Sequence, residues 1–239
     1  MEEYTGIILK KISYKESSEI IYLYTLDGLI GVLVHGSKKM KSPFLNLTKV
    51  LNYVKVFVSG KNLKVLRDAE IIENNTSIIV TDLEKYTYVT HMVELIYYFA
   101  THEHDHDKLL GFILKIIPEI KARADYIPYI YMLELKLLYL LGVNPNLKTC
   151  LSCDETKELV FSVKDGSCFC KNHLPNDYFS NEVLEAVKQL YYFDLEKTRE
   201  IEINSRVLPE IRKLLDEYYD YHLNYHSKAR KMLKGLIGY

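Results

Sequence analysis

Four residues near the middle of the chain have the types and spacing of ligands for one zinc ion. Cys150 and Cys153 form one pair, Cys170 and His173 form a second, and sixteen residues lie between the pairs. Each C-x-x-C or C-x-x-H turn can direct two donors at one ion, and thiolate and imidazole are the donors of structural Zn²⁺ sites. Four protein ligands leave no open position for water or substrate, so the pattern predicts one structural zinc that stabilises the fold.

Cys168 leaves a second ligand set open. The Cys168-Phe169-Cys170 sequence would give an all-cysteine site. The x-x spacing turns back on itself in a knuckle, and Gly166 lies where a strand would lead into such a turn. The spacing favours His173 as the fourth ligand, with Cys168 as the alternative. A loop of thiols without metal is the third interpretation.

A histidine-rich string predicts a competing chemistry. His102, Glu103 and His106 satisfy H-E-x-x-H, in which two histidines on one helical face hold zinc and the glutamate acts as a base. Asp105 and Asp107 crowd this string, so we favour a solvated loop in which one of them caps the helix that begins near Lys108. We find no G-x-S-x-G elbow and no phosphate-binding glycine loop, so we expect the protein not to be an enzyme.

A basic loop is the candidate for nucleic-acid contact. Residues 1–80 carry 11 Lys and Arg against 8 Asp and Glu, a net charge of +3, whereas residues 81–239 have a net charge of −4. A glycine-containing loop with three cations follows the third expected strand, as phosphate binding requires. The candidate phosphate contacts in this loop are Lys38, Lys39 and Lys41, and those outside it are Lys10, Lys11 and Arg67. A second basic run, His226 to Lys234, fits a solvated helix end.

The elements that must position these residues divide into strands and then helices, which predicts an α+β fold. Short β patterns with turn residues between them favour a small barrel; they are Gly6–Lys10, Ile20–Thr25, Leu29–Val34, Tyr53–Val58 and Leu63–Leu66, with Asp27-Gly28 as a hairpin turn. After Asp82 the apolar residues recur with helical spacing. The expected helices are Tyr86–Ala100, Leu109–Ile120 and Tyr126–Leu141, one capped by Ser180 or Asn181 that runs through Leu190, and one capped by Ser205 that runs past Tyr225. Residues 146–178 interrupt the helices as a polar insertion that carries the cysteines.

Composition places the chain in the cytoplasm. The start Met1-Glu2-Glu3-Tyr4 lacks a basic region followed by an apolar one, and no apolar run approaches the roughly 20 residues that span a bilayer. All four cysteines lie between positions 150 and 170, so they cannot link distant parts of the fold, and a reducing compartment favours thiolate ligands over disulfides.

Taken in order, several stretches resemble the RecO family of bacterial recombination mediators. The resemblance covers nearly the whole chain, and the order of the stretches carries it; they are Gly6-Ile-Ile-Leu-Lys10, Tyr14-Lys-Glu16-Ser17, Gly28-Leu-Ile-Gly31, His35-Gly-Ser-Lys38-Lys39, Ala69-Glu70, Glu94-Leu95, Leu138 to Pro145 with Cys150-Leu-Ser-Cys153, and Tyr221-His222 with Lys228. The chain departs from the family's usual second C-x-x-C pair by placing His173 where the last cysteine would be, which is a chemically conservative change.

The resemblance implies an oligonucleotide-binding (OB) barrel at residues 1–80 and a helical domain at residues 81–239. It also implies a nucleoid-associated mediator that binds single- and double-stranded DNA, recognises the C-terminal tail of single-stranded-DNA-binding protein, joins RecR, and allows RecA loading or strand annealing. Zinc would support the fold and not the activity. The alternatives are the zinc-dependent hydrolase and a structural zinc-knuckle adaptor without a nucleic-acid role.

Overall fold

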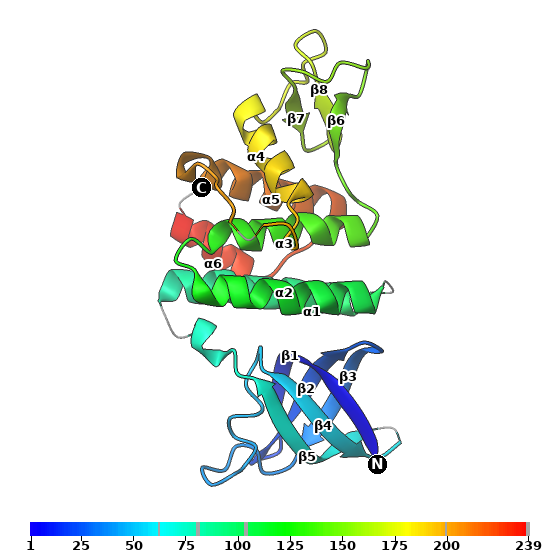
Figure 1. The fold of residues 1–239 in the computed structure, drawn as a ribbon, viewed down its shortest axis with the longest axis vertical. Helices are drawn as coiled ribbons and strands as arrows, with labels where there is room; N and C mark the ends of the chain where they lie inside the picture. Colours follow the sequence, from blue (N-terminus) through cyan, green and yellow to red (C-terminus); the bar gives the residue numbers. More distant parts are fainter. Residues whose placement is uncertain (62, 80–81, 103–104, 199, 238–239) are drawn as a thin grey trace. The chain divides into compact units, whose positions relative to one another are not determined.

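The chain begins with five strands that close into a barrel, as the β patterns predicted (Figure 1). The strands are β1 Glu2–Tyr14, β2 Ser18–Thr25, β3 Gly28–Val34, β4 Tyr53–Ser59 and β5 Lys64–Glu73. Their order around the barrel is β1-β2-β3-β5-β4; only the β3–β5 pair is parallel. Branched and aliphatic side chains such as Ile8, Ile21 and Val56 fill the interior. This is the five-stranded architecture of an OB-like barrel.

The hairpin between β2 and β3 has the turn that Asp27-Gly28 predicted. Gly28 has a φ of +97°, which a residue with a Cβ rarely adopts. The Thr25 hydroxyl donates to the Gly28 carbonyl at 2.9 Å, and the Asp27 amide donates to the Thr25 hydroxyl at 3.2 Å. β1 and β5 are longer than expected, because backbone pairing continues through residues whose side chains show no apolar alternation: β1 pairs with β4 at its start and with β2 at its end, and β5 pairs with β4.

The segment between β3 and β4, residues 35–52, is held against one end of the barrel by buried groups. Leu47 and Leu51 are buried, and the Thr48 hydroxyl donates to the carboxylate of Glu19 at 2.9 Å. The side-chain amide of Asn52 donates to the Asn46 carbonyl at 2.8 Å. These contacts hold a long connection in one conformation, against the conformational entropy that a loop of this length gains when it is free.

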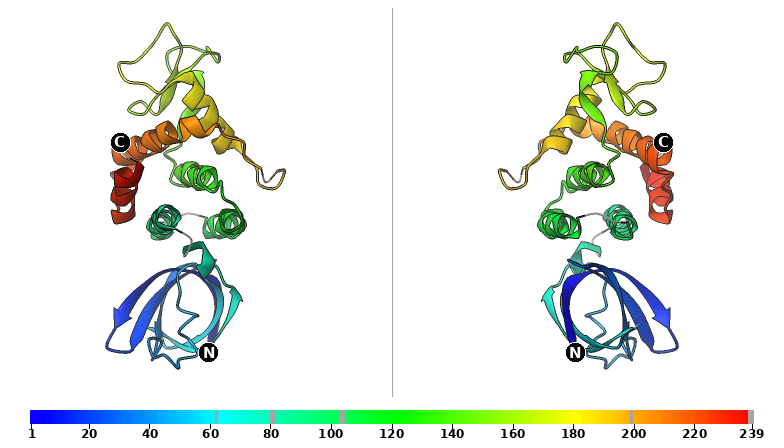
Figure 2. Two further views of the ribbon diagram at one scale, coloured as in Figure 1. Left: turned by 90° about the vertical axis from the view of Figure 1, so that its left-hand side faces the viewer. Right: turned by 90° about the vertical axis from the view of Figure 1, so that its right-hand side faces the viewer.

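Two helices follow the barrel, α1 Leu83–Ala100 and α2 His106–Ala122, after a short 3₁₀ turn, η1 Thr76–Ile79. They overlap in Figure 1, and Figure 2 shows them end-on, next to each other. The Asp82 side chain accepts from the Lys85 amide at 2.7 Å and caps α1, and Asp105 accepts from the Lys108 amide at 3.2 Å, which confirms the capping role expected of Asp105.

The structure describes residues 1–61, 63–79, 82–102, 105–198 and 200–237, and is a computed structural model. It forms two compact units, Met1–Lys121 and Ala122–Tyr239, so α1 and α2 belong with the barrel in the first unit. The boundary at residue 80 separates strands from helices and, as a domain boundary, stays a prediction. No helix in the described parts of the chain is long and apolar enough to cross a membrane.

In the second unit α4 and α5 pack against α3. The helices are α3 Ile127–Leu140, α4 Asn181–Tyr192, α5 Leu208–Leu223 and α6 Lys228–Ile237, with a 3₁₀ turn η2 Ser205–Val207 before α5. α3 buries residues on every side, as its nearly continuous apolar sequence requires. Ser180 accepts from the Val183 amide at 3.4 Å and caps α4, which confirms one of the two expected caps.

The expected single helix from Ser205 past Tyr225 is wrong at both ends. Asn204, not Ser205, accepts the capping hydrogen bond, from the Arg206 amide at 3.1 Å. At the other end Asn224 takes a left-handed conformation with a φ of +48° and ends α5 at Leu223. Asparagine tolerates this conformation better than most residues, so the chain turns there before α6.

Candidate functional site

The cysteine-bearing insertion folds as a small sheet in the second unit, where the sequence had indicated only a polar loop. Its strands are β6 Asn146–Cys150, β7 Val160–Ser162 and β8 Ser167–Phe169, in the order β6-β8-β7. Because β6 and β8 are parallel, their carboxyl ends meet at one edge. Cys150 ends β6 and Cys170 follows β8, so the topology brings the two cysteine-bearing turns together.

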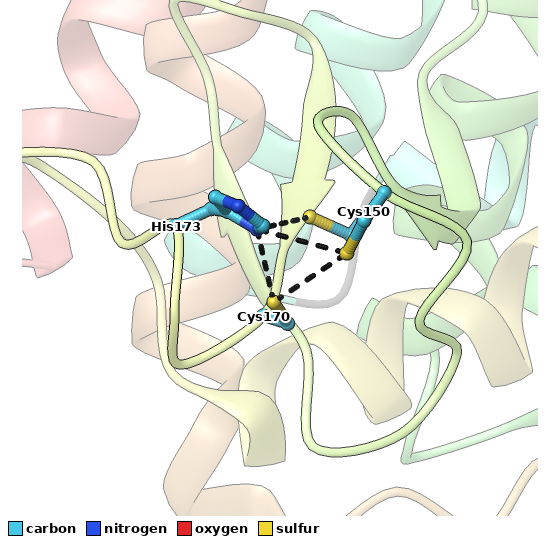
Figure 3. Close-up of side chains that lie close together, drawn as sticks. Cys150, Cys170 and His173 are labelled. Carbon is cyan, nitrogen blue, oxygen red and sulfur yellow. Dashed lines mark hydrogen bonds between the residues drawn. The ribbon is translucent and has the colours of Figure 1, made fainter.

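Cys150, Cys153, Cys170 and His173 form one cluster. Their ligand atoms all lie within 4.8 Å of one another. The Cys153 and Cys170 Sγ atoms are 3.8 Å apart, and the His173 Nδ1 atom lies 3.7, 3.6 and 3.3 Å from the Sγ atoms of Cys150, Cys153 and Cys170. Figure 3 shows the side chains of Cys150, Cys170 and His173 directed toward one another.

These separations fit a tetrahedral zinc ion. With Zn–S bonds of 2.3 Å and Zn–N bonds near 2.0 Å, the edges of the tetrahedron are about 3.8 Å between two sulfurs and about 3.5 Å between sulfur and nitrogen. The cluster is therefore consistent with a Cys₃His zinc site that has no open coordination position. Such a metal would supply folding free energy by joining the ends of β6 and β8.

Cys168 lies outside the cluster. It sits within β8, opposite Cys150 in the strand register, and its side chain is buried. Burial raises the pKa of the Cys168 thiol to about 11, which keeps it neutral. β8 ends at Phe169, so Cys168 lies within the strand whereas Cys170 lies beyond it, in the turn that carries His173.

The thiol of Cys150 is the one whose surroundings favour the thiolate. Burial opposes its ionisation, but hydrogen bonds from the backbone amides of Cys170 and Ser152 and from the Cys153 thiol outweigh this and lower the Cys150 pKa to about 6. Amide donors at a knuckle turn favour the charged sulfur that a metal binds.

His102 and His106 of the H-E-x-x-H string belong to separate helix ends and do not share one helical face. His102 follows the end of α1, and its ring nitrogen lies 2.8 Å from the Tyr98 carbonyl. His106 begins α2 and its Nδ1 atom lies 3.0 Å from the Tyr24 hydroxyl. Glu103 lies outside the described residues. Among the described residues the only cluster of three or more potential metal ligands is the Cys₃His group.

The loop lysines lie on the anchored β3–β4 connection. The Lys38 amide donates to the Ser17 carbonyl at 3.0 Å, and the Lys39 amide donates to the Gly36 carbonyl at 3.1 Å. Lys39 and Lys41 are exposed and Lys38 is half-buried. Within the described residues these three ammonium groups have no ion-pair partner, so they remain available for phosphate oxygens.

The other candidate cations each contact another side chain. Lys10 lies on β1 with its Nζ atom 4.6 Å from the ring centroid of Tyr97, and the Nζ atom of Lys11 lies 3.0 Å from a carboxylate oxygen of Glu19. Arg67 is exposed on β5, next to β3 in the barrel, and its Nε donates to the Ser59 hydroxyl at 2.6 Å. β1 is separated from β3 by β2, so Lys10 and Lys11 do not lie on a strand next to β3.

The interpretation of His226 to Lys234 as a solvated helix end is wrong for Arg230. The run opens α6, and Arg230 is buried with its Nε bonded to the Asp216 carboxylate and its Nη1 2.8 Å from that of Asp220. The spacing of residues within the run could not predict the burial of Arg230, because the two carboxylates come from α5, on the far side of the break at Asn224. A buried arginine needs such partners.

Comparison with known proteins covers both parts of this structure. Residues 1–75 match the family described as Recombination protein O N terminal, and residues 80–231 match Recombination protein O C terminal. The DNA repair protein RecO of Listeria innocua is 28% identical over 243 residues, covering 99% of this chain and 95% of the relative. That of Bacillus pumilus is 27% identical over 235 residues, covering 95% and 91%. With a five-stranded barrel, a helical unit and matches along nearly its full length, the chain belongs to the RecO family of DNA repair and recombination proteins.

Proposed function

We propose that this protein is a non-catalytic recombination mediator that binds DNA through the basic loop after β3. It acts on single-stranded DNA coated by its binding protein, contacts the C-terminal tail of that protein, joins RecR, and promotes RecA loading and strand annealing. It binds double-stranded DNA as well, because the phosphate contacts serve both forms. Family membership implies DNA and recombination proteins as partners.

The observation that carries the DNA-binding part is the availability of Lys38, Lys39 and Lys41. Their loop is anchored through Thr48 and Asn52, so a backbone of fixed position presents flexible cations. Phosphate contact requires ammonium groups that are exposed and not already neutralised. Lys10, Lys11 and Arg67 are assigned supporting roles, because each has a contact with another side chain.

The test is a fluorescence-anisotropy titration of the full chain with labelled single-stranded DNA at several salt concentrations, with and without the single-stranded-DNA-binding protein. Replacing Lys38, Lys39 and Lys41 together with alanine should weaken binding and reduce the slope of log affinity against log salt by about 2, since each phosphate contact on a single strand contributes about 0.7. Binding that persists on coated DNA supports the mediator.

A matched control removes the same charge elsewhere. Lys115, Lys157 and Lys197 are exposed and lie outside the loop, and their replacement with alanine should change the slope by less than half as much. Equal effects of the two triple variants would show a diffuse electrostatic attraction and reject the loop. Absence of DNA binding by the wild type at low salt would instead favour a structural adaptor.

A further inference from the structure

A groove in the second unit lies beside the zinc-site sheet and has no role in the function proposed above. Its volume is about 810 Å³, and none of the four clustered cysteine and histidine ligands lines it. One wall is the turn after β7 with the segment Asn176–Phe179, and the other is the outer face of α5. The His222 ring nitrogen lies 2.7 Å from the Val163 carbonyl, which holds that turn against α5.

Aromatic side chains form the apolar part of the groove. Val163 is buried and Phe179 is half-buried, whereas Tyr178 and Tyr221 are 49% and 61% exposed. Exposed tyrosines beside a concave surface can contact a ligand with their rings while their hydroxyl groups stay in water. The groove therefore offers contact area for aliphatic groups.

Acidic side chains surround this apolar part. Asp177, Glu210, Glu217 and Asp220 line the groove together with two lysines, Lys164 and Lys213. Asp220 is paired with Arg230 at 2.8 Å and with Lys234 at 3.3 Å, so three carboxylates and two lysines remain, with a net charge of −1. This charge repels nucleic-acid phosphates and acidic peptides and attracts cations. The groove is thus complementary to a different kind of ligand from the basic loop of the barrel.

Asp177, Glu210 and Glu217 can accept new partners. The Lys164–Asp177 and Lys213–Glu217 pairs, at 3.0 and 3.9 Å, join exposed side chains, and such pairs contribute little and exchange readily. Glu210 is exposed in the first turn of α5 and has no ion-pair partner among the described residues.

The groove already combines a cation with an aromatic ring. The Nζ atom of Lys213 lies 5.9 Å from the ring centroid of Phe179, within the range of a cation–π interaction. An incoming arginine or lysine side chain could make the same type of contact with the more exposed rings of Tyr178 and Tyr221.

We propose that this groove binds a short basic peptide segment of a partner protein. Its arginine or lysine side chains pair with Glu210 and Glu217, and its aliphatic side chains lie against Tyr178 and Tyr221. The proposal concerns a surface distinct from the DNA-binding loop and does not depend on DNA binding.

The test uses the full chain and a fluorescein-labelled octapeptide of alternating arginine and leucine, with alternating glutamate and leucine as the control peptide. Anisotropy should show binding of the arginine peptide at least tenfold tighter than that of the glutamate peptide. The combined Glu210→Lys and Glu217→Lys variant should weaken the arginine peptide at least tenfold. A matched variant, Glu84→Lys with Glu202→Lys, reverses two exposed glutamates outside the groove and should change affinity less than twofold.

Tyrosine variants test the apolar contacts. Tyr221→Ala should weaken the arginine peptide about fivefold, whereas Tyr139→Ala, which removes a tyrosine of similar exposure (65%) on α3 outside the groove, should have less than a twofold effect. Unchanged circular dichroism would exclude unfolding of either variant. Equal effects of groove and control variants, or tighter binding of the glutamate peptide, would overturn the proposal, as would failure of the arginine peptide to bind.

Discussion

The guanidinium of Arg212 on α5 and the carboxylate of Glu134 on α3 form a two-pronged ion pair inside the second unit. Arg212 Nη1 lies 2.5 Å from one oxygen of Glu134 and Nη2 lies 2.8 Å from the other, and both side chains are almost fully buried. Burial opposes the charge on Arg212, but Glu134 and Asp216 outweigh it and hold the Arg212 pKa well above its usual value. Asp216 in turn binds Arg230 of α6, so charged contacts link three helices.

Removing one member of this pair should lower the free energy of unfolding more than removing both. Glu134→Ala should lower the free energy of unfolding by about 3–5 kcal/mol, because it leaves a buried guanidinium with only Asp216 as an anionic partner. A double variant, Glu134→Leu with Arg212→Met, should lose less, since both buried charges are gone. Urea denaturation followed by circular dichroism measures both values. A double variant less stable than Glu134→Ala would contradict this account.

The zinc assignment predicts different zinc contents for variants of Cys150 and Cys168, which lie opposite each other on paired strands. Cys150→Ser should abolish zinc binding, whereas Cys168→Ser should retain one zinc per chain, because Cys168 lies outside the cluster. If zinc is present at about a thousandfold excess over its dissociation constant, its loss removes about 4 kcal/mol and lowers the unfolding midpoint by about 10 °C. Metal analysis and thermal unfolding of the two variants provide the check.

The histidine string supplies a further control for the metal. Replacing His102 and His106 with alanine should leave the zinc content unchanged, because the two residues belong to separate helix ends. Retention of zinc in Cys150→Ser together with its loss in the histidine variant would show that the histidines hold the metal. That result would favour the zinc-dependent hydrolase.

Single lysine variants should distinguish an ammonium group that is available for DNA phosphates from one that is already in an ion pair. Lys39→Ala should reduce the salt slope of single-stranded DNA binding by about 0.7, the contribution of one phosphate contact. Lys11→Ala should have less than half this effect, because Lys11 lies 3.0 Å from Glu19 and already has a partner. A larger slope change for Lys11→Ala than for Lys39→Ala would move the DNA path from the loop onto β1.

Glu19 should make the barrel sensitive to acid. Burial raises the pKa of Glu19, but the hydrogen bonds from Lys11 and Thr48 outweigh it and hold the pKa below its usual value of 4.5. Because the folded-state pKa is lowered, the charged carboxylate stabilises the fold above about pH 4.5, and this contribution is lost as the pH falls through the folded-state value.

The variant Glu19→Gln tests whether the stabilisation by Glu19 is lost as the pH falls. The wild type should unfold at a higher temperature than the variant at pH 7, and the difference should shrink as the pH falls below 4.5. Glu84→Gln, an exposed glutamate on α1, serves as the control and should show no such narrowing. A difference that grows on acidification would contradict the lowered pKa.

Local pattern in the sequence was sufficient for the barrel, the main helices and the membership of the Cys₃His cluster. Alternation along β4, the Asp27-Gly28 turn and the Ser180 cap depend on residues close together in the chain, so spacing predicts them. The two C-x-x pairs are likewise local, and each turn places its donors without help from distant residues.

Only the tertiary structure decided the features that join distant segments. The parallel register of β6 and β8 brings the two cysteine-bearing turns to one edge, and neither strand shows an apolar pattern that would predict it. The burial of Arg230 depends on Asp216 and Asp220 across the Asn224 break, and the different availability of Lys11 and Lys39 depends on where Glu19 lies. Residue type determines which charges exist in the sequence. Which of them are buried, paired or free depends on long-range packing, because the free energy of a charge is set by its neighbours in space.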